Sequence, residues 1–281
     1  MPQWNCACPN CQAARKGLIP SRTQSCVAVT GDGQHWYLVN ASPDFSVQVQ
    51  SFPDLAPESQ PPRNTRISGV FLTNADLDHL LGLFSLREGS ELDIYATRSV
   101  RELAEESLGM QTVLNSFCAT RWHEPVSGAE QPLGLKYRAI ELGSRPPRFA
   151  GVTHSKEPGQ SVAYEFTDSQ QTRLVVAPDV DALNPGLLEV LNTADIVLFD
   201  GTFWSAEELQ LVKPGAPGAS EMGHMTIRDG SLKLLQSLRA KAKVYIHINN
   251  TNPILARDSA ERRAVEAAGI VVGQDGLEFE L

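Results

Sequence analysis

An apolar stretch of β-strand type, from Ile67 to Leu72, leads into a polar loop that carries Asp76, Asp78 and His79. Apolar residues at helical spacing begin at Leu80, so the segment reads as strand, loop and helix. The carboxyl end of a strand is where open α/β folds gather their ligand sites. Carboxylate and imidazole donors this close together suit a divalent cation, and the alternative is an ordinary capped turn.

Three later apolar runs of strand type end in the same way, in Asp179, Asp200 and His247. A role as N-cap or turn former explains one acid after a strand, but it does not readily explain a polar residue of this kind after every one of these strands. Asn184 and Pro185 already supply the cap and first turn of the helix that follows Asp179. Imidazoles and carboxylates with open coordination positions are the ligands expected of a catalytic first-row metal. The recurrence therefore favours a metal site.

Cys6, Cys8 and Cys11 follow a C-x-C-x-x-C spacing. Three thiolates this close can meet one tetrahedral Zn²⁺ whose fourth ligand comes from elsewhere in the chain. The alternative is a group of buried or redox-active thiols. Cys26 and Cys118 stand alone in the sequence, and we expect them to be small core residues.

The 281 residues, 42% of them hydrophobic, can bury one substantial core, and we expect a single domain over residues 1–281. A net charge of −9 disfavours nucleic acid as a partner, because binding phosphates needs a positive field. No apolar run approaches the 18 residues of a membrane span, and no basic segment leads into an apolar one at the start. We therefore expect a cytoplasmic protein that does not enter membranes. Residues 25–30 and 36–39 flank Gly31-Asp32-Gly33 and read as a β-hairpin.

The strand followed by Asp-His, and then His, Asp, Asp and His in order, resembles the metallo-β-lactamase superfamily. Four motifs resemble, within that superfamily, the pyrroloquinoline quinone biosynthesis protein B family. They are PQWNCxCPxC at residues 2–11, NASPD at 40–44, MGHM at 222–225 and HINNTNP at 247–253. The resemblance covers nearly the whole chain and implies an αββα sandwich with metals at the strand edges.

Two features depart from the family pattern. The family carries a strand and a glycine-rich loop ahead of the first motif, and Met1 stands in their place, so we expect that first strand to be missing. The superfamily's hydrolases carry His-x-His-x-Asp-His, whereas this chain has Asn74-x-Asp76-x-Asp78-His79. An amide oxygen binds transition metals more weakly than imidazole, so we expect a weak first metal position and a mononuclear site.

The resemblance implies a role for each candidate residue. The catalytic metal would be held by Asp78, His79, Asp179 and His247. Asp76, His154 and His224 would orient the substrate or transfer protons, and Asp200 would support the site or bridge. Cys6, Cys8 and Cys11 would hold a structural Zn(II), with Asn250 as one candidate fourth ligand and His224 as the other.

Two imidazoles, carboxylates and open positions resemble a non-haem Fe(II) oxygenase site. The family resemblance implies hydroxylation of a tyrosine-derived intermediate with molecular oxygen during cofactor biosynthesis. The alternatives are a metal-dependent hydrolase, such as a phosphodiesterase, and a carrier that binds the finished quinone without chemistry. The sequence leaves a homodimer open.

Overall fold

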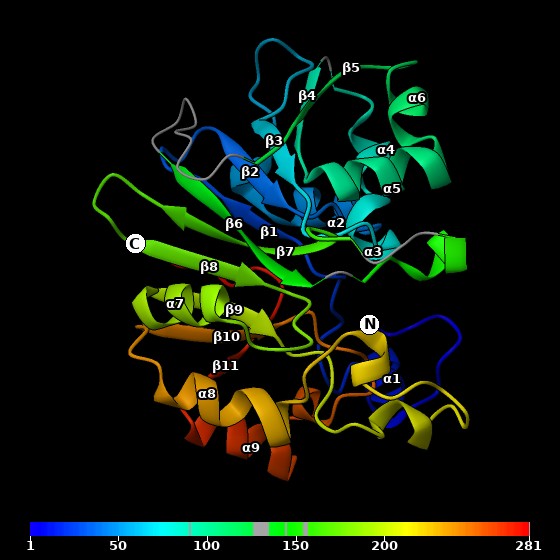
Figure 1. Ribbon diagram of the computed structural model, residues 1–281, viewed down its shortest axis with the longest axis vertical. Coiled ribbons are helices and arrows are strands. Elements are labelled where there is room, and N and C mark those ends of the chain that lie inside the picture. The colour runs from blue at the N-terminus through cyan, green and yellow to red at the C-terminus, as the bar shows by residue number, and fades with distance from the viewer. Residues whose placement is uncertain (90, 126–134, 144, 154–156, 281) are drawn as a thin grey trace. The chain divides into compact units, whose positions relative to one another are not determined.

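The computed structural model describes residues 1–89, 91–125, 135–143, 145–153 and 157–280 (Figure 1). Packing divides the chain into two compact units. We call Gln24–Thr172 the central unit, and Met1–Thr23 together with Arg173–Leu281 the terminal unit. Each unit combines strands with helices, as the predicted α/β class requires. The expectation of a single domain over residues 1–281 stays a prediction.

The central unit contains a five-stranded sheet of order β1-β2-β3-β4-β5. β1 and β2 are antiparallel, which confirms the predicted hairpin, and β2 to β5 are parallel. β6 and β7 pair with each other antiparallel. The strands are β1 (Val27–Val29), β2 (Trp36–Val39), β3 (Ile67–Phe71), β4 (Glu91–Tyr95), β5 (Ala119–His123), β6 (Lys136–Gly143) and β7 (Ser161–Thr167). The helices are α2 (Phe45–Ser51), α3 (Leu77–Leu80), α4 (Leu83–Leu86), α5 (Arg98–Leu108) and α6 (Met110–Leu114), with 3-10 turns at Pro53–Leu55 and Arg148–Thr153.

Alternation along the central strands gives the sheet two apolar faces. Leu38, Val70 and Ile94 form one buried cluster with side chains of α4, α5 and α6. On the other face, Phe71 stacks on Tyr95 and meets the Tyr164 ring of β7 at 5.1 Å. Burial on both faces is typical of parallel strands, and it explains why β3 reads as a continuous apolar run.

The terminal unit contains four parallel strands in the order β11-β10-β9-β8. They are β8 (Arg173–Ala177), β9 (Ile196–Asp200), β10 (Ala242–Ile246) and β11 (Val271–Val272). The helices are α1 (Pro9–Arg15), α7 (Pro185–Thr193), α8 (Leu232–Ser237) and α9 (Ala260–Ala267), with a π-helical turn at Ile227–Ser231 and 3-10 turns at Glu208–Leu211, Ser220–Met222 and Pro253–Leu255. α7 packs on β8 and α9 packs on β11. The Asn184 side chain caps α7 and Pro185 begins it, as predicted.

The helix after β3 begins earlier than the sequence indicated. The apolar spacing predicts a helix that begins at Leu80, but α3 begins at Leu77 and a second short helix, α4, follows it. Asp76 is the N-cap, and its carbonyl accepts hydrogen bonds from the backbone N–H groups of His79 and Leu80. Asp78 and His79 therefore lie in the first helical turn and not in a loop. The acids that suggested a loop are those that favour the first turn of a helix.

Among the helices that the structure describes, none is long and apolar enough to cross a bilayer.

Candidate metal centres

His79 is held inside the central unit by the strand end that precedes it. Its ring is buried, and Nδ1 lies 3.2 Å from the hydroxyl of Thr73. Asn40 in turn accepts a hydrogen bond from the Thr73 backbone N–H at 2.9 Å. A Cβ at Gly82 would lie 2.4 Å from the Ser42 carbonyl oxygen, so only glycine allows the chain to pass this closely. The NASPD motif thus supports the segment that carries His79.

The terminal unit brings Asp179, His224 and His247 together. Asp179 follows β8, His247 follows β10, and His224 lies in the loop before the π-helical turn. Nε2 of His224 and Nε2 of His247 each lie 3.8 Å from Asp179 Oδ1. One donor atom from each of the three residues falls within a 4.8 Å group. The terminal unit therefore provides two imidazoles and one carboxylate that face a common point.

The loop conformation at His224 explains how so distant a residue reaches this group. Gly223 ends a 3-10 turn with φ of 85°, a left-handed conformation that favours glycine. The Met225 N–H then donates to the carbonyl of Val180, beside Asp179, at 2.6 Å. The MGHM motif is thereby tied to the end of β8.

Asp200, at the end of β9, is fully buried and accepts four hydrogen bonds. Oδ1 accepts from the N–H and the hydroxyl of Thr202, and Oδ2 accepts from the N–H of Val180 and from Nδ1 of His224. Burial raises the pKa of Asp200, but the charges of His224 and His247 and these hydrogen bonds hold it below its ordinary value. A carboxylate with four donors orients its neighbours, so we expect Asp200 to support the site and not to bridge metals.

The contact with Asp200 also fixes the His224 ring. Nδ1 lies 2.8 Å from Asp200 Oδ2 and donates to it, so the Nε2 lone pair is directed toward Asp179. Burial lowers the pKa of His224, but the neighbouring Asp200 carboxylate outweighs burial and raises it above its ordinary value. Such an imidazole suits proton transfer, and with Nε2 unprotonated it also suits metal ligation.

The distances within this group match a single cation. Ligand atoms about 2.1 Å from one ion lie about 3.0 to 3.4 Å apart in octahedral or tetrahedral geometry. The 3.8 Å separations need to close by well under 1 Å. Two imidazoles and a carboxylate suit iron, zinc or nickel better than calcium or magnesium. The donor chemistry of the terminal unit therefore fits a transition metal.

The remaining predicted residues have different outcomes. Asp78 Oδ2 lies 3.9 Å from His79 Nε2 within the central unit. The four-residue set of Asp78, His79, Asp179 and His247 stays a prediction, as does the catalytic role of Asp76. His154 lies outside the described residues. His224 lies far from Asp179 and His247 in the sequence, yet the structure places it beside both.

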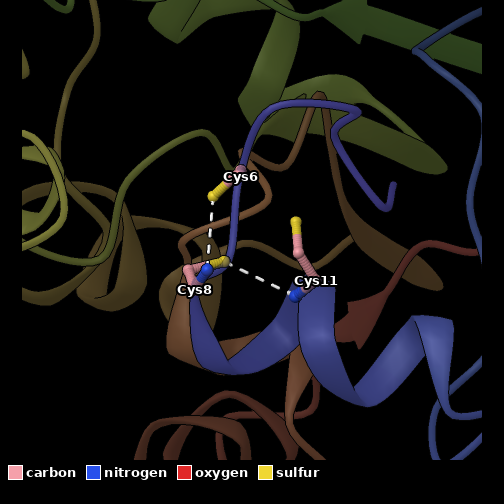
Figure 2. Close-up of side chains that lie close together, drawn as sticks. All are labelled: Cys6, Cys8 and Cys11. Atoms are coloured by element: carbon pink, nitrogen blue, oxygen red, sulfur yellow. Dashed lines mark hydrogen bonds between the residues drawn. The ribbon is translucent and has the colours of Figure 1, made fainter.

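Cys6, Cys8 and Cys11 lie together around the start of α1, with their sulfurs turned toward one another (Figure 2). The Cys8 N–H donates to the Cys6 sulfur at 3.4 Å, and the Cys11 N–H donates to the Cys8 sulfur at 3.5 Å. The Gln3 N–H approaches the Cys11 sulfur at 3.3 Å. Hydrogen bonds from backbone N–H groups stabilise thiolates, which are the form that binds zinc.

The Asn250 side chain lies against all three sulfurs. Its terminal amide nitrogen is 3.3, 3.5 and 3.4 Å from the sulfurs of Cys6, Cys8 and Cys11. The two ends of an asparagine amide can be exchanged by rotation, so the oxygen can occupy this place. A tetrahedral zinc with Zn–S of about 2.3 Å and Zn–O of about 2.0 Å would separate sulfur and oxygen by about 3.5 Å. The residues present thus fit a zinc with three cysteine ligands and one amide oxygen.

The sequence did not indicate two residues that support the candidate metal sites. Thr202 joins Asp200 to His247 through its hydroxyl. Asn10 is buried and donates to the carbonyls of Asn250 and Asn252 at 3.0 and 2.8 Å, which ties α1 to the segment after His247. Both are short polar side chains next to motif residues. Their position beside Asp200 and Cys11 was the one available signal, because isolated Thr and Asn usually indicate turns.

Comparison with known proteins was made for the whole chain. The profile of the beta-lactamase superfamily domain matches residues 35–248. The coenzyme PQQ synthesis protein B of Cupriavidus necator is 39% identical over 291 residues, covering 100% of this chain and 95% of that protein. The protein of the same name from Klebsiella pneumoniae strain 342 is 38% identical, covering 100% and 94%.

Solved structures agree with these relatives. The crystal structure of Zn(2+)-bound PqqB from Methylobacterium extorquens has a TM-score of 0.91 and 32% identity, covering 100% of this chain and 95% of that one. A diphosphatase of the PhnP family has a TM-score of 0.70 at 20% identity, a likeness of fold alone. The predicted metallo-β-lactamase fold is confirmed. The chain belongs to the coenzyme PQQ synthesis protein B family of the β-lactamase superfamily.

Proposed function

We propose that this protein acts in PQQ biosynthesis as an Fe(II)-dependent oxygenase that hydroxylates a tyrosine-derived intermediate. The observation that carries the proposal is the convergence of Asp179 and His247, two donors of the type that non-haem iron sites use, with the His224 imidazole beside them. The names of its relatives support the biosynthetic role, and the fold supports a metal-dependent enzyme.

The proposed reaction converts an aromatic C–H bond to C–OH with one atom of O₂. The second oxygen atom leaves as water and takes two protons and two electrons from a small-molecule reductant such as ascorbate. Fe(II), when bound, supplies the activation of oxygen. His224, held by Asp200, is the residue that we assign to proton transfer, because its imidazole has a pKa suited to that work.

Asp179 and His247 are the proposed metal ligands of the terminal unit, and Asp78 and His79 are the predicted ligands of the central unit. Cys6, Cys8, Cys11 and Asn250 form the proposed structural zinc site. Its tie to α1 through Asn10 supports a structural role, because zinc bound there would fix the segment that follows His247.

The test is anaerobic loading with Fe(II), followed by oxygen-consumption and mass measurements on tyrosine-containing probes with ascorbate. The wild-type chain should consume oxygen and add one oxygen atom to the probe. His247→Ala should abolish high-affinity iron binding and activity. His35→Ala is the matched control, because His35 is exposed and pairs with Asp32 in the β1–β2 hairpin.

Two experimental results would overturn the proposed oxygenase function in favour of another function. A chain that binds two metals tightly and hydrolyses phosphodiesters without oxygen is a hydrolase, for which the His224 and Asp200 pair would also serve. A chain that binds the finished quinone and shows neither reaction is a carrier. Asn74→His tests whether the chain binds one metal or two, because it restores the imidazole that hydrolases of this superfamily carry at that position.

A further inference from the structure

The Thr202 hydroxyl occupies the junction between β9 and the segment after β10. Its oxygen lies 2.6 Å from Asp200 Oδ1, 2.8 Å from the His247 carbonyl oxygen and 2.9 Å from His247 Nδ1. Thr202 is only 6% exposed, so water does not replace these partners. All three contacts lie within the terminal unit.

The number of protons available decides how these contacts are made. A hydroxyl carries one proton, and both the Asp200 carboxylate and the His247 carbonyl can only accept hydrogen bonds. If Thr202 gave its proton to His247 Nδ1, both oxygen–oxygen contacts would lack a proton at 2.6 and 2.8 Å. The proton must therefore go to an oxygen, and the charge-assisted contact with Asp200 is the shortest. The contact with His247 can then be made only if Nδ1 donates its own hydrogen to Thr202.

A neutral imidazole has one N–H, so a hydrogen on Nδ1 leaves the lone pair on Nε2. Nε2 is the atom of His247 that lies 3.8 Å from Asp179. The opposite tautomer would direct an N–H at the proposed metal position and could not ligate there. Metal-binding histidines are held in the correct tautomer by a partner of the second ring nitrogen in the same way.

The backbone at His247 is in a sparsely populated conformation. His247 has φ of 54°, a left-handed conformation that costs free energy for any residue except glycine. Neighbouring contacts fix Thr202 itself, since the Asn249 N–H donates to its carbonyl at 3.1 Å and Asn252 donates to the carbonyl of Gly201 at 2.9 Å.

We infer that Thr202 is a positioning residue that holds His247 as the Nδ1–H tautomer and thereby makes Nε2 its metal-binding atom. The inference adds a residue to the proposed site and rests on the proposed function only in taking His247 as a ligand.

Two substitutions separate the hydroxyl from the shape of the side chain. Thr202→Val removes the hydroxyl with little change in volume, and Thr202→Ser keeps the hydroxyl and removes the methyl group. Thr251→Val is the matched control, because the Thr251 hydroxyl lies in the segment that carries His247 but donates to Glu208. A general loosening of the segment would affect Thr251→Val as well.

The tautomer is measured first on the metal-free protein by two-bond ¹H–¹⁵N correlation, which reports which ring nitrogen carries hydrogen. The chain has six histidines, and the His247 signals are those lost in His247→Gln. We expect a single Nδ1–H tautomer in the wild type and in Thr202→Ser, and a mixture in Thr202→Val. A wild-type His247 that carries its hydrogen on Nε2 would overturn the inference, whatever the Thr202 variants show.

Iron affinity is measured next by competition with a chelator, on protein whose cysteine site is loaded with zinc. Thr202→Val should bind Fe(II) about 10 to 100 times more weakly, the usual effect of losing such a partner. Thr202→Ser and Thr251→Val should stay close to the wild type. Equal losses in Thr251→Val and Thr202→Val would overturn the inference. If the wild type binds no Fe(II), and Thr202→Val alone among the variants loses the Nδ1–H form, the proposed function is contradicted and the role of Thr202 is supported.

Discussion

Glu208 is a buried carboxyl that the proposed reaction does not use. It accepts hydrogen bonds from the Thr251 hydroxyl at 2.6 Å and the Trp204 N–H at 2.7 Å. Burial raises its pKa from 4.5 to about 7, against the opposing effect of these two hydrogen bonds. We predict that Glu208→Gln changes how the stability of the chain depends on pH.

The magnitude follows from the pKa difference between the folded and unfolded states. Below about pH 4.5 the carboxyl is protonated in both states, and the difference contributes nothing. As pH rises toward 7, the unfolded chain releases the proton first, so the free energy of unfolding falls, and above 7 the loss is complete. A tenfold change in proton affinity is worth about 1.4 kcal/mol, so the full loss is about 3 kcal/mol. Between about pH 5 and about pH 8 the loss is about 2.5 kcal/mol.

Glu208→Gln removes this loss. Like the protonated carboxyl, its amide has one acceptor and one donor, so the oxygen can accept from the Trp204 N–H and the amide N–H can donate to the Thr251 hydroxyl. Relative to the wild type, the variant should therefore have a similar stability at low pH and should gain about 2.5 kcal/mol from about pH 5 to about pH 8.

The measurement is urea unfolding at several pH values, followed by the fluorescence of the four tryptophans. Glu207→Gln is the matched control. It removes the same charge, but from a carboxyl that is exposed and not buried. Parallel stability curves for Glu208→Gln and the wild type would refute the reasoning, since they would mean that Glu208 titrates alike in both states.

Four further predictions concern the sites and their support. Cys8→Ser should lower zinc content and thermal stability together, because structural zinc contributes to folding directly, and one zinc per chain with normal stability would contradict it. Asn250→Asp, which keeps an oxygen donor, should retain more zinc than Asn250→Leu. His224→Ala should keep the catalytic metal and lower turnover by about 10² or more, and loss of metal would reassign His224 as a ligand. Gly201→Ala should destabilise the chain by about 1 to 3 kcal/mol, because its Cβ would lie 2.7 Å from the Cβ of Tyr245, whereas Gly143→Ala meets no atom within 4 Å.

The sequence predicted the strand ends well because burial on both faces leaves a clear apolar run. β3, β8, β9 and β10 were found in this way, and Asp179 and His247 follow two of them. The start of α3 was not found, because an extended N-cap at Asp76 and two polar residues in the first turn look like a loop until the hydrogen bonds are seen. Boundaries of so short a helix carry little periodic signal.

The position of His224 illustrates a different limit. Residues 201–226 contain only short 3-10 turns, so neither periodicity nor spacing indicates which strand end the loop approaches. The hydrogen bond from Met225 to Val180 and the contact with Asp200 decide it, and both depend on the folded backbone. The MGHM motif singled out His224 through the family resemblance, but it did not indicate which strand end the loop approaches.

In each unit, a threonine just after a strand contacts Nδ1 of a histidine. Thr73 follows β3 by two residues and contacts Nδ1 of His79, and Thr202 follows β9 by two residues and contacts Nδ1 of His247. A threonine just past a strand end has a short, β-branched side chain whose hydroxyl is held close to the backbone, so it can orient a ring from the next segment at little cost in entropy. Sequence reasoning that looks for acids and imidazoles finds the candidate ligands and overlooks these hydroxyls, although in each unit the hydroxyl contacts Nδ1 of a histidine.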